Sequence, residues 1–425
     1  MPVYRKIFTL VIIFSSVFFH PAAAEETLNW EECIREAAKH HPDLIAAQEI
    51  VQQSVDSKTI TASTLFPQIN SNLNASTART DSGTTHSTKD AYSYGLTGTQ
   101  LIFDGIKTIN NVNAASENIK AAKENFRFTS TTVRYRLRSA FISLLTAQEM
   151  LRITREIFDI RRGNLELITL RYESGLEHKG ALLTAEADLA HARYDISQAE
   201  RNMEVTQRNL TKEMGRAEFV PMAAKGDWTV RDAAKDKPDF VALAKNNPSL
   251  QKLIAQKNAA EFGIKSAYGN FAPALNGQAG VNKTNSKWPA NNDQWNLGLT
   301  VSMPIFEGGL RFAQVSQAKA LADQLRENAR STRDSLVSTL EQTWASLQDT
   351  MDFVKVRQKY LIATEERSKI AQAQYAIGYI TFDNWTIIEN DLVTAKKNFL
   401  NAQAAMLLAE AGWIQAKGET LEYAQ

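Results

Sequence analysis

The stretch from 295 to 315 reads WNLGLTVSMPIFEGGLRFAQV, and it joins two kinds of secondary structure. Up to Ile305, apolar residues alternate with polar or small ones, which is typical of a β-strand with one apolar face. After Gly309 the period changes. From Arg311 to Ile377 there are 67 residues without glycine or proline, and apolar residues recur at steps of three, four and seven. These steps predict a helix of the coiled-coil type, about 100 Å long at 1.5 Å per residue.

The same order of patterns occurs about 200 residues earlier in the chain. The segment AKHHPDL at 38–44 returns as AKNNPSL at 244–250, with an offset of 206 residues. A Tyr-x-x-Gly turn at 172–175 returns at 375–378, with an offset of 203 residues. Self-similarity at this length predicts two internal structural repeats.

The repeats predict two halves behind a signal peptide. A basic start, a 13-residue apolar core and three alanines indicate that residues 1–24 form a secretory signal peptide. We expect the first half, 25–236, to contain a helix at 28–65, strands at 67–77 and 91–103, a long helix at 106–171, a helix at 178–215 and a linker at 216–236. We expect the second half, 237–425, to contain a helix at 240–270, strands at 273–282 and 294–305, a long helix at 310–377, a helix at 381–417 and a short tail.

Composition excludes several classes of protein. The chain has 48 basic and 47 acidic residues, so its charge gives no reason to expect a nucleic acid partner. Its single cysteine, Cys33, cannot form an intrachain disulfide and is expected to be a small apolar residue of a helix. After the signal peptide, no segment is apolar enough to predict a transmembrane helix.

The predicted strands require an assembly. Each is about ten residues long, as a tilted strand across a membrane should be. Four strands per chain leave two open edges, which lipid does not tolerate, and a closed barrel needs about eight strands. Three copies would supply twelve. The sequence therefore predicts a trimer with a 12-stranded transmembrane β-barrel, continued below the membrane by a long α-helical coiled-coil tunnel, which the family resemblance described below places in the periplasm.

The alternation also predicts which residues face the lumen and which lie at the membrane interface. A row of asparagines facing lipid would be costly, so we expect the lumen to be lined by Asn70, Asn72, Asn74, Asn276, Asn282 and Asn296. Three aromatic residues near strand ends are expected at the membrane interface, with packing within the sheet as the alternative: Tyr92, Tyr94 and Trp295. Trp288 lies in a polar loop and is expected to be simply exposed.

The ordered set of motifs resembles the TolC family of outer membrane efflux proteins over essentially the whole mature chain. The run Pro304–Gly309 and the turn Arg171–Gly175 carry this resemblance together with the repeat. It implies a homotrimer in the outer membrane of a Gram-negative bacterium, acting as a passive exit duct for efflux or type I secretion. The implied partners are a periplasmic adaptor (membrane fusion protein) and an inner-membrane transporter of the RND, ABC or MFS type. Fold does not fix cargo, so drugs, metals and protein all stay open.

The resemblance further assigns roles at the turns that end the long helices. In the family these turns form the tunnel tip and meet the adaptor, which assigns docking to Arg171, Tyr172, Gly175, Leu176, Tyr375 and Gly378. The tip is often closed by an acidic constriction, but this chain has Glu166 and Lys369 six residues before the turn tyrosines. We expect a mixed Glu166/Lys369 ring that weakens cation selectivity, with solvent-exposed helix charges as the alternative.

No motif predicts catalysis. The pair His40-His41 is replaced by Asn246-Asn247 in the other copy, which indicates a helix cap rather than a metal site. The segment Gly175–Gly180 resembles a phosphate loop, but Ala181-Leu182 follows where Lys-Ser/Thr is required. We therefore expect no metal, no cofactor and no enzymatic activity. A periplasmic coiled-coil adaptor is the main alternative, disfavoured by the amphipathic strands, and a periplasmic enzyme is a second one.

Overall fold

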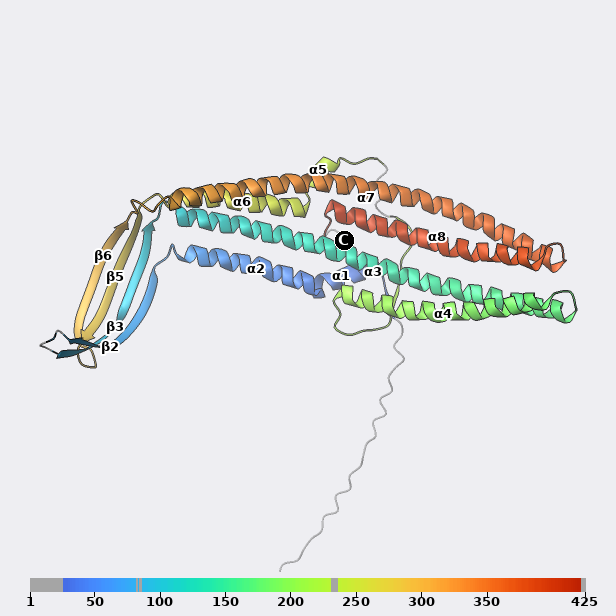
Figure 1. Cartoon of the computed structure of the whole chain (residues 1–425), viewed down its shortest axis with the longest axis horizontal. Helices are drawn as coiled ribbons and strands as arrows, with labels where there is room; N and C mark the ends of the chain where they lie inside the picture. The colour runs from blue at the N-terminus through green and yellow to red at the C-terminus, as the bar shows by residue number, and fades with distance from the viewer. Residues whose placement is uncertain (1–25, 82, 84–85, 231–235, 422–425) are drawn as a thin grey trace, which may run out of the picture.

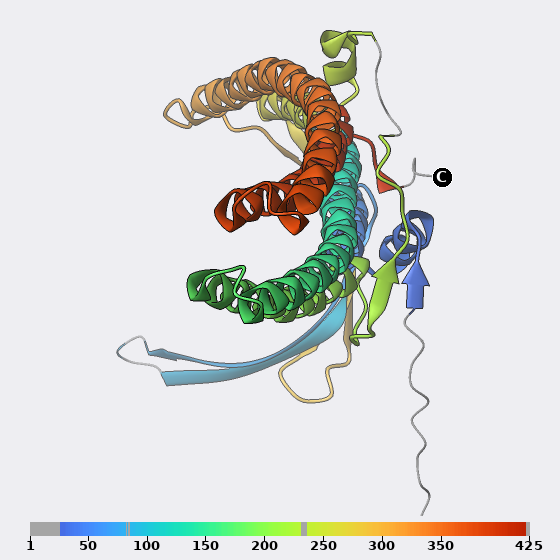
Figure 2. The same cartoon turned by 90° about the vertical axis from the view of Figure 1, so that its right-hand side faces the viewer.

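The computed structural model describes residues 26–81, 83, 86–230 and 236–421. The predicted signal peptide, 1–24, lies outside the described residues. A sheet stands at one end of the elongated chain, and helices run from it to two turns at the opposite end (Figure 1). Viewed along the long axis, the helices form a curved wall with a concave and a convex side (Figure 2).

Two helices of equal length span the wall. They are α3 (Lys107–Glu173) and α7 (Leu310–Ala376), with 67 residues each. Along α3, α2 (Pro42–Ser63) and α4 (Lys179–Met214) follow one another end to end, and α6 and α8 do the same along α7 (Figure 1). The bounds of this second pair are α6 (Pro248–Gly269) and α8 (Phe382–Lys417). Because α3 also contacts α6 and α8, it is packed along its whole length.

The predictions of single helices at 28–65 and 240–270 are wrong. Each region forms two helices, α1 (Trp30–His40) before α2 and α5 (Phe240–Lys245) before α6. The breaks fall before prolines, which cannot donate a backbone hydrogen bond and which disfavour helix at the preceding residue. The predicted caps are confirmed: His41 Nδ1 accepts from the Asp43 amide at 3.2 Å, and Asn247 Oδ1 accepts from the Ser249 amide at 2.9 Å.

The four strands of the sheet are antiparallel, in the order β2-β3-β5-β6. They are β2 (Gln68–Asp81), β3 (His86–Phe103), β5 (Ala274–Asn285) and β6 (Asn292–Ser302). The first hairpin continues past the predicted strand ends, where Thr77 Oγ1 donates to Asp90 Oδ1 at 2.7 Å. Strand β6 stops before the predicted residue 305 because Pro304 has no amide hydrogen to donate. Within the described chain, β2 and β6 each leave one edge unpaired.

The described part of the predicted linker, 216–230, is in fact packed against the middle of the helical wall. It contains β4 (Met222–Ala224), which pairs in parallel with β1 (Glu26–Leu28). Two glutamine side chains on the helices bind β4: Gln148 accepts from the Ala224 amide at 2.8 Å, and Gln207 donates to the Met222 carbonyl at 2.8 Å. Trp228 then packs against three separate clusters of buried residues. This segment therefore packs against both halves and is more than a covalent link between them.

An arginine braces the same central region. Arg216 donates to Glu26 at 2.7 and 3.0 Å and to Glu36 at 2.5 and 2.8 Å. These hydrogen bonds hold the pKa of Glu26 below its usual value and raise the pKa of Arg216. Cys33 is fully buried in α1, as expected of a small apolar helix residue, and burial raises the pKa of its thiol to about 12.

Among the residues that the structure describes, none of the helices combines the length and apolar character needed to cross a membrane.

The glycine that ends α4 gives a test of this packing. Gly215 has φ +78°, and a Cβ added there would lie 2.4 Å from the His40 carbonyl oxygen. Gly215→Ala should therefore lower the free energy of unfolding by about 3 kcal/mol, measured by urea denaturation of the detergent-purified protein. Gly163→Ala, inside α3 with no neighbouring atom within 4 Å, is the matched control and should raise stability by about 1 kcal/mol. Equal midpoints for the two variants would contradict this account.

Candidate functional site at the helix turns and sheet faces

The two turns at the end of the wall have the same backbone geometry. Gly175 and Gly378 lie in the left-handed region, at φ +70° and +78°. The amide of the next residue donates back to the helix in each case, from Leu176 to the Arg171 carbonyl and from Tyr379 to the Gln374 carbonyl, both at 2.8 Å. This is the Schellman arrangement that ends many helices. Glycine is needed at both positions for its conformation.

Apolar side chains at both turns face outward. In a Schellman turn the residue after the glycine often packs back onto its own helix, yet Leu176 is 67 % exposed and Tyr379 is 77 % exposed. Ile377 is 81 % exposed. Neither Ile377 nor Tyr379 is among the residues that the sequence predicts for the tip. The repeat could have revealed Tyr379, because it lies 203 residues after Leu176, the same offset that relates the two glycines.

The prediction that Tyr375 meets the adaptor directly needs correction, because this residue is only 1 % exposed. Its ring stacks on Trp385, with centroids 4.4 Å apart and planes at 12°. The guanidinium of Arg171 lies 4.8 Å from the centroid of the same ring. The hydroxyl of Tyr375 donates to Glu177 Oε2 at 2.8 Å, and burial raises the pKa of that hydroxyl. Tyr375 thus supports the turns from inside, whereas Tyr172 stays partly exposed.

A partly buried polar network joins the two helix pairs behind the turns. Arg161, on α3, has its Nη1 3.4 Å from Asp188 Oδ2 on α4. Its Nη2 donates to Asn390 Oδ1 on α8 at 2.5 Å. Beside it, Ser368 on α7 donates to the buried carboxylate of Glu389 at 2.5 Å. All four helices of this end are therefore linked by hydrogen bonds or ion pairs, in which Arg161, Ser368 and Glu389 are buried.

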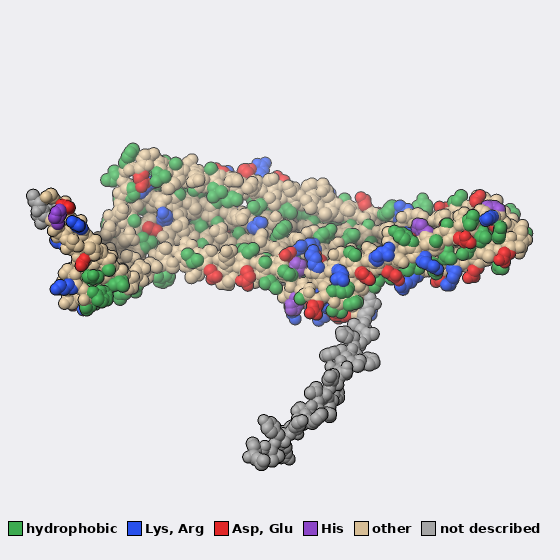
Figure 3. Space-filling view, turned by 60° about the horizontal axis from the view of Figure 1, so that its bottom comes forward, with side chains coloured by type: hydrophobic (Ala, Val, Ile, Leu, Met, Phe, Trp, Pro, Cys, Tyr) green, Lys and Arg blue, Asp and Glu red, His purple; other side chains and the backbone are tan. Residues whose placement is uncertain are grey.

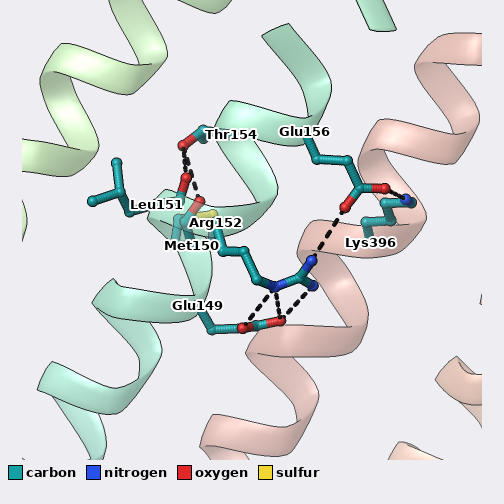
Figure 4. Close-up of polar contacts among 7 residues, drawn as sticks. All are labelled: Glu149, Met150, Leu151, Arg152, Thr154, Glu156 and Lys396. Atoms are coloured by element: carbon teal, nitrogen blue, oxygen red, sulfur yellow. Dashed lines mark hydrogen bonds and ion pairs between the residues drawn. The ribbon is translucent and has the colours of Figure 1, made fainter. Parts of the chain in front are cut away.

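A second set of contacts joins α3 to α8 nearer the middle of the wall (Figure 4). Arg152 binds Glu149 on its own helix, with its Nη2 2.7 Å from Oε1, and its Nη1 lies 3.4 Å from Glu156 Oε2. Glu156 also accepts a hydrogen bond from Lys396 on α8. The chain of charges crosses the helix interface, and its exposed members contribute little to stability singly.

Glu166 and Lys369, proposed for a constriction, lie on different helices and are both exposed. The ammonium of Lys369 is 3.7 Å from Glu366 Oε2, one turn earlier on α7. Within one chain, therefore, the ion pair of Lys369 is local to its own helix.

The register of the strands places the predicted lumen residues on one face. Residues directly opposite each other in an antiparallel pair share a face. Asn72 lies opposite Gly95, which lies opposite Asn282, and Asn296 lies opposite Gly280 two residues before Asn282. The same alternation brings Asn70, Asn74 and Asn276 to this face. The other face carries apolar residues, including Ile69, Leu73, Leu96, Val281, Leu297, Leu299 and Val301.

The three predicted interface aromatics lie on the apolar face. Tyr94 is opposite Leu73 in the register, Tyr92 is two residues away, and Trp295 is opposite Val281. The expectation that Trp288 is exposed is confirmed, but the residue also has partners. It is 60 % exposed, but its ring centroid lies 5.8 Å from that of Tyr94 and 6.2 Å from that of Tyr92. The sequence placed Trp288 in a loop and could not show where that loop folds.

The two turn tyrosines provide a matched pair of substitutions. Tyr375→Phe removes the hydroxyl that donates to Glu177, at a cost of about 1 kcal/mol. We expect backbone amides in the turn at 174–178 to exchange hydrogen about fivefold faster. Tyr172→Phe changes the partly exposed equivalent in the first half and should leave exchange unchanged. Equal acceleration by both variants, measured by hydrogen–deuterium exchange, would contradict the bracing role of Tyr375.

Comparison with known proteins identifies the family. The family model described as "Outer membrane efflux protein" matches residues 33–216 and 241–419, one segment in each half. The chain is 22 % identical to outer membrane efflux protein BepC of Brucella suis biovar 1 over 430 residues, which covers 96 % of this chain and 89 % of that protein.

Solved structures share the fold. The CusC channel superposes with a TM-score of 0.81 at 20 % identity, covering 91 % of each chain. The open state of the MtrE outer membrane channel of Neisseria gonorrhoeae gives 0.80 at 17 % identity, covering 92 % of this chain and 89 % of that one. The resemblance inferred from the motifs is confirmed, and the chain belongs to the outer membrane efflux protein family, the TolC-like proteins of the outer membrane.

Proposed function

We propose that this protein is a trimeric outer membrane channel that acts as the passive exit duct of a tripartite efflux or type I secretion system. One observation carries the proposal: a four-stranded sheet with one apolar and one polar face continues directly into a curved wall of helices. A sheet of this kind suits lipid on one side and water on the other. The wall would extend the same water-filled duct into the periplasm.

The open edges support assembly into a ring. β2 ends one side of the sheet and β6 ends the other, so β6 of one copy can pair with β2 of the next. Such head-to-tail contacts close into a ring when the rotation allows. Large apolar side chains are exposed on the helices that form the edges of the wall, including Phe312 and Tyr360 on α7 and Ile60 on α2. Three copies would give twelve strands around the axis. Each copy would contribute its two internal repeats to the ring.

The faces of the sheet set the direction of the barrel. The asparagine face would line the lumen, and the apolar face would meet lipid, since unsatisfied amides in hydrocarbon cost several kcal/mol each. Tyr92, Tyr94 and Trp295 would then stand on the lipid side, where aromatic residues are enriched at membrane interfaces. The helix turns would lie farthest from the membrane.

The turns are the surface that we assign to the adaptor. Leu176, Ile377 and Tyr379 present apolar surface there, supported from behind by Tyr375 and Arg171. Exposed apolar groups on a rigid support are typical of protein interaction sites. An inner-membrane transporter of the RND, ABC or MFS type would supply the energy, and its identity would set the cargo. The alternative of a periplasmic adaptor is disfavoured by the family to which the chain belongs.

Assembly and conductance test the function directly. Outer-membrane fractions should contain a heat-modifiable trimer, and purified trimers should form stable aqueous pores in planar bilayers. The physical reason is that only a closed ring satisfies the backbone groups at the edges of β2 and β6. Recovery as a soluble periplasmic monomer without conductance would refute the duct.

The docking surface can be tested apart from the pore. Ile377→Asp and Tyr379→Asp place a charge where an apolar contact is proposed, so export should fall at least tenfold. Conductance of the purified trimers should stay at the wild-type level. Glu173→Gln, at the neighbouring turn, is the control and should leave export unchanged. Full export by both aspartate variants would sink the docking role of this turn.

The constriction is a separate proposal. We propose that Glu166 and Lys369 of the three copies form a mixed ring near the tip, in place of an all-acidic one. Lys369→Ala would remove the positive charges and should raise the cation-to-anion permeability ratio roughly twofold in single-channel recordings. Lys245→Ala, on α5 outside the wall, is the control. An unchanged ratio in Lys369→Ala would leave both residues as ordinary surface charges.

A further inference from the structure

The loop between β5 and β6, residues 286–291, folds back onto the apolar face of the sheet. The hydroxyl of Tyr94 donates to the Ala290 carbonyl oxygen at 3.2 Å, and Ala290 is buried. Tyr94 belongs to the apolar face, because Leu73 lies directly opposite it. The loop lies at the end of the sheet remote from the helices (Figure 1) and on the convex side of the wall (Figure 2). The loop thus packs on this face instead of extending past the strand ends.

The folded loop builds an aromatic platform. The rings of Trp288, Tyr92 and Tyr94 meet in tilted and edge-on contacts, a geometry that aromatic pairs prefer. Trp288 keeps most of its surface exposed even though two other rings support it. The platform is therefore both fixed in place and open to the surroundings on the outside of the sheet.

Basic side chains border the platform. Lys283 is opposite Tyr94 in the register, and its Nζ lies 3.1 Å from Asp293 Oδ1. Lys287 precedes Trp288 in the loop and is exposed. The next row toward the helices is apolar and contains Trp295. In Figure 3, hydrophobic side chains lie beside basic ones at the sheet end of the molecule. The platform thus marks the level at which the apolar face gives way to charge.

We propose that the loop at 286–291, together with Tyr92, Tyr94 and Lys283, forms a docking site for the phosphorylated sugar headgroup of an outer-leaflet glycolipid. The inference rests on the proposed function, because it requires the apolar face to meet lipid. The strand ends remote from the periplasmic helices would then reach the outer leaflet. Lysine ammonium groups bind phosphate as point charges. An open tryptophan ring offers apolar surface to the C–H face of a sugar, and the apolar rows below would hold the acyl chains.

Lipid binding to intact trimers tests the site. Wild-type, Lys287→Gln and Trp288→Ala trimers would be titrated with diphosphorylated lipid A, and bound lipid counted by native mass spectrometry. Each variant should bind about tenfold more weakly, because each loses one charge-assisted or apolar contact. Lys245→Gln, an exposed lysine on α5 far from the sheet, is the matched control and should bind as wild type. Wild-type affinity in both loop variants would overturn the proposal.

Two further arms identify the ligand. Phosphatidylglycerol carries phosphate without a sugar, and dephosphorylated lipid A carries the sugar without phosphate. Both should bind the wild-type trimer at least tenfold more weakly than diphosphorylated lipid A. Equal binding of either lipid would overturn the assignment to a phosphorylated glycolipid.

A fluorescence measurement covers variants that assemble poorly. Trp288→Phe keeps an aromatic ring, and the difference between its spectrum and that of wild type isolates Trp288. Acyl chains brominated close to the headgroup should quench this difference signal in bilayers, and bromine near the bilayer centre should not. Absence of quenching would overturn the placement. Conductance separates the two proposals. If the wild-type protein forms pores but shows no lipid selectivity, the lipid site alone is refuted. If the wild-type protein forms no pores, the duct is refuted.

Discussion

Each 67-residue helix can exist in this chain because other helices pack along its whole length. In proteins, most of the stability of a helix comes from packing of its apolar face and not from the intrinsic propensity of its residues. In the first half, α2 and α4 together cover α3, and α6 and α8 cover α7 in the second. Because α3 also packs against α6 and α8, neither half is a separate domain. The packed segment around β4 and Trp228 binds the halves across this shared interface.

The same long helices deliver two similar turns to one end, and the turns differ in how they are supported. Gly175 and Gly378 give both turns one backbone path. Trp385 then stacks on Tyr375 and buries it, whereas the equivalent Tyr172 stays partly exposed. The consequence is a rigid turn that still presents Ile377 and Tyr379 outward. A docking surface needs this combination, since rigid support lowers the entropy that binding must overcome.

At the opposite end, the strand register decides which residues share a face of the sheet. It collects Asn72, Asn282 and Asn296 on one face and apolar residues such as Leu73 and Val281 on the other. The loop at 286–291 adds an aromatic and basic border to the apolar face. The proposed duct and its lipid contact both depend on a sheet with one face suited to water and one suited to lipid. The proposed adaptor surface lies at the other end of the same chain.

The sequence by itself determined the period of each element. Steps of three, four and seven required long helices, alternation required amphipathic strands, and the Tyr-x-x-Gly turns marked the helix ends. Those features are local, so spacing along the chain is enough to reveal them. The predictions from the sequence were wrong about the helix breaks at Pro42 and Pro248, about the length of the first hairpin and about the packed linker. Only the tertiary structure decided that Tyr375 is buried while Tyr379 is exposed, and that Trp288 joins Tyr92 and Tyr94. These outcomes depend on residues far apart in the chain, such as Glu177 with Tyr375 and Tyr94 with Ala290, and no local pattern records such contacts.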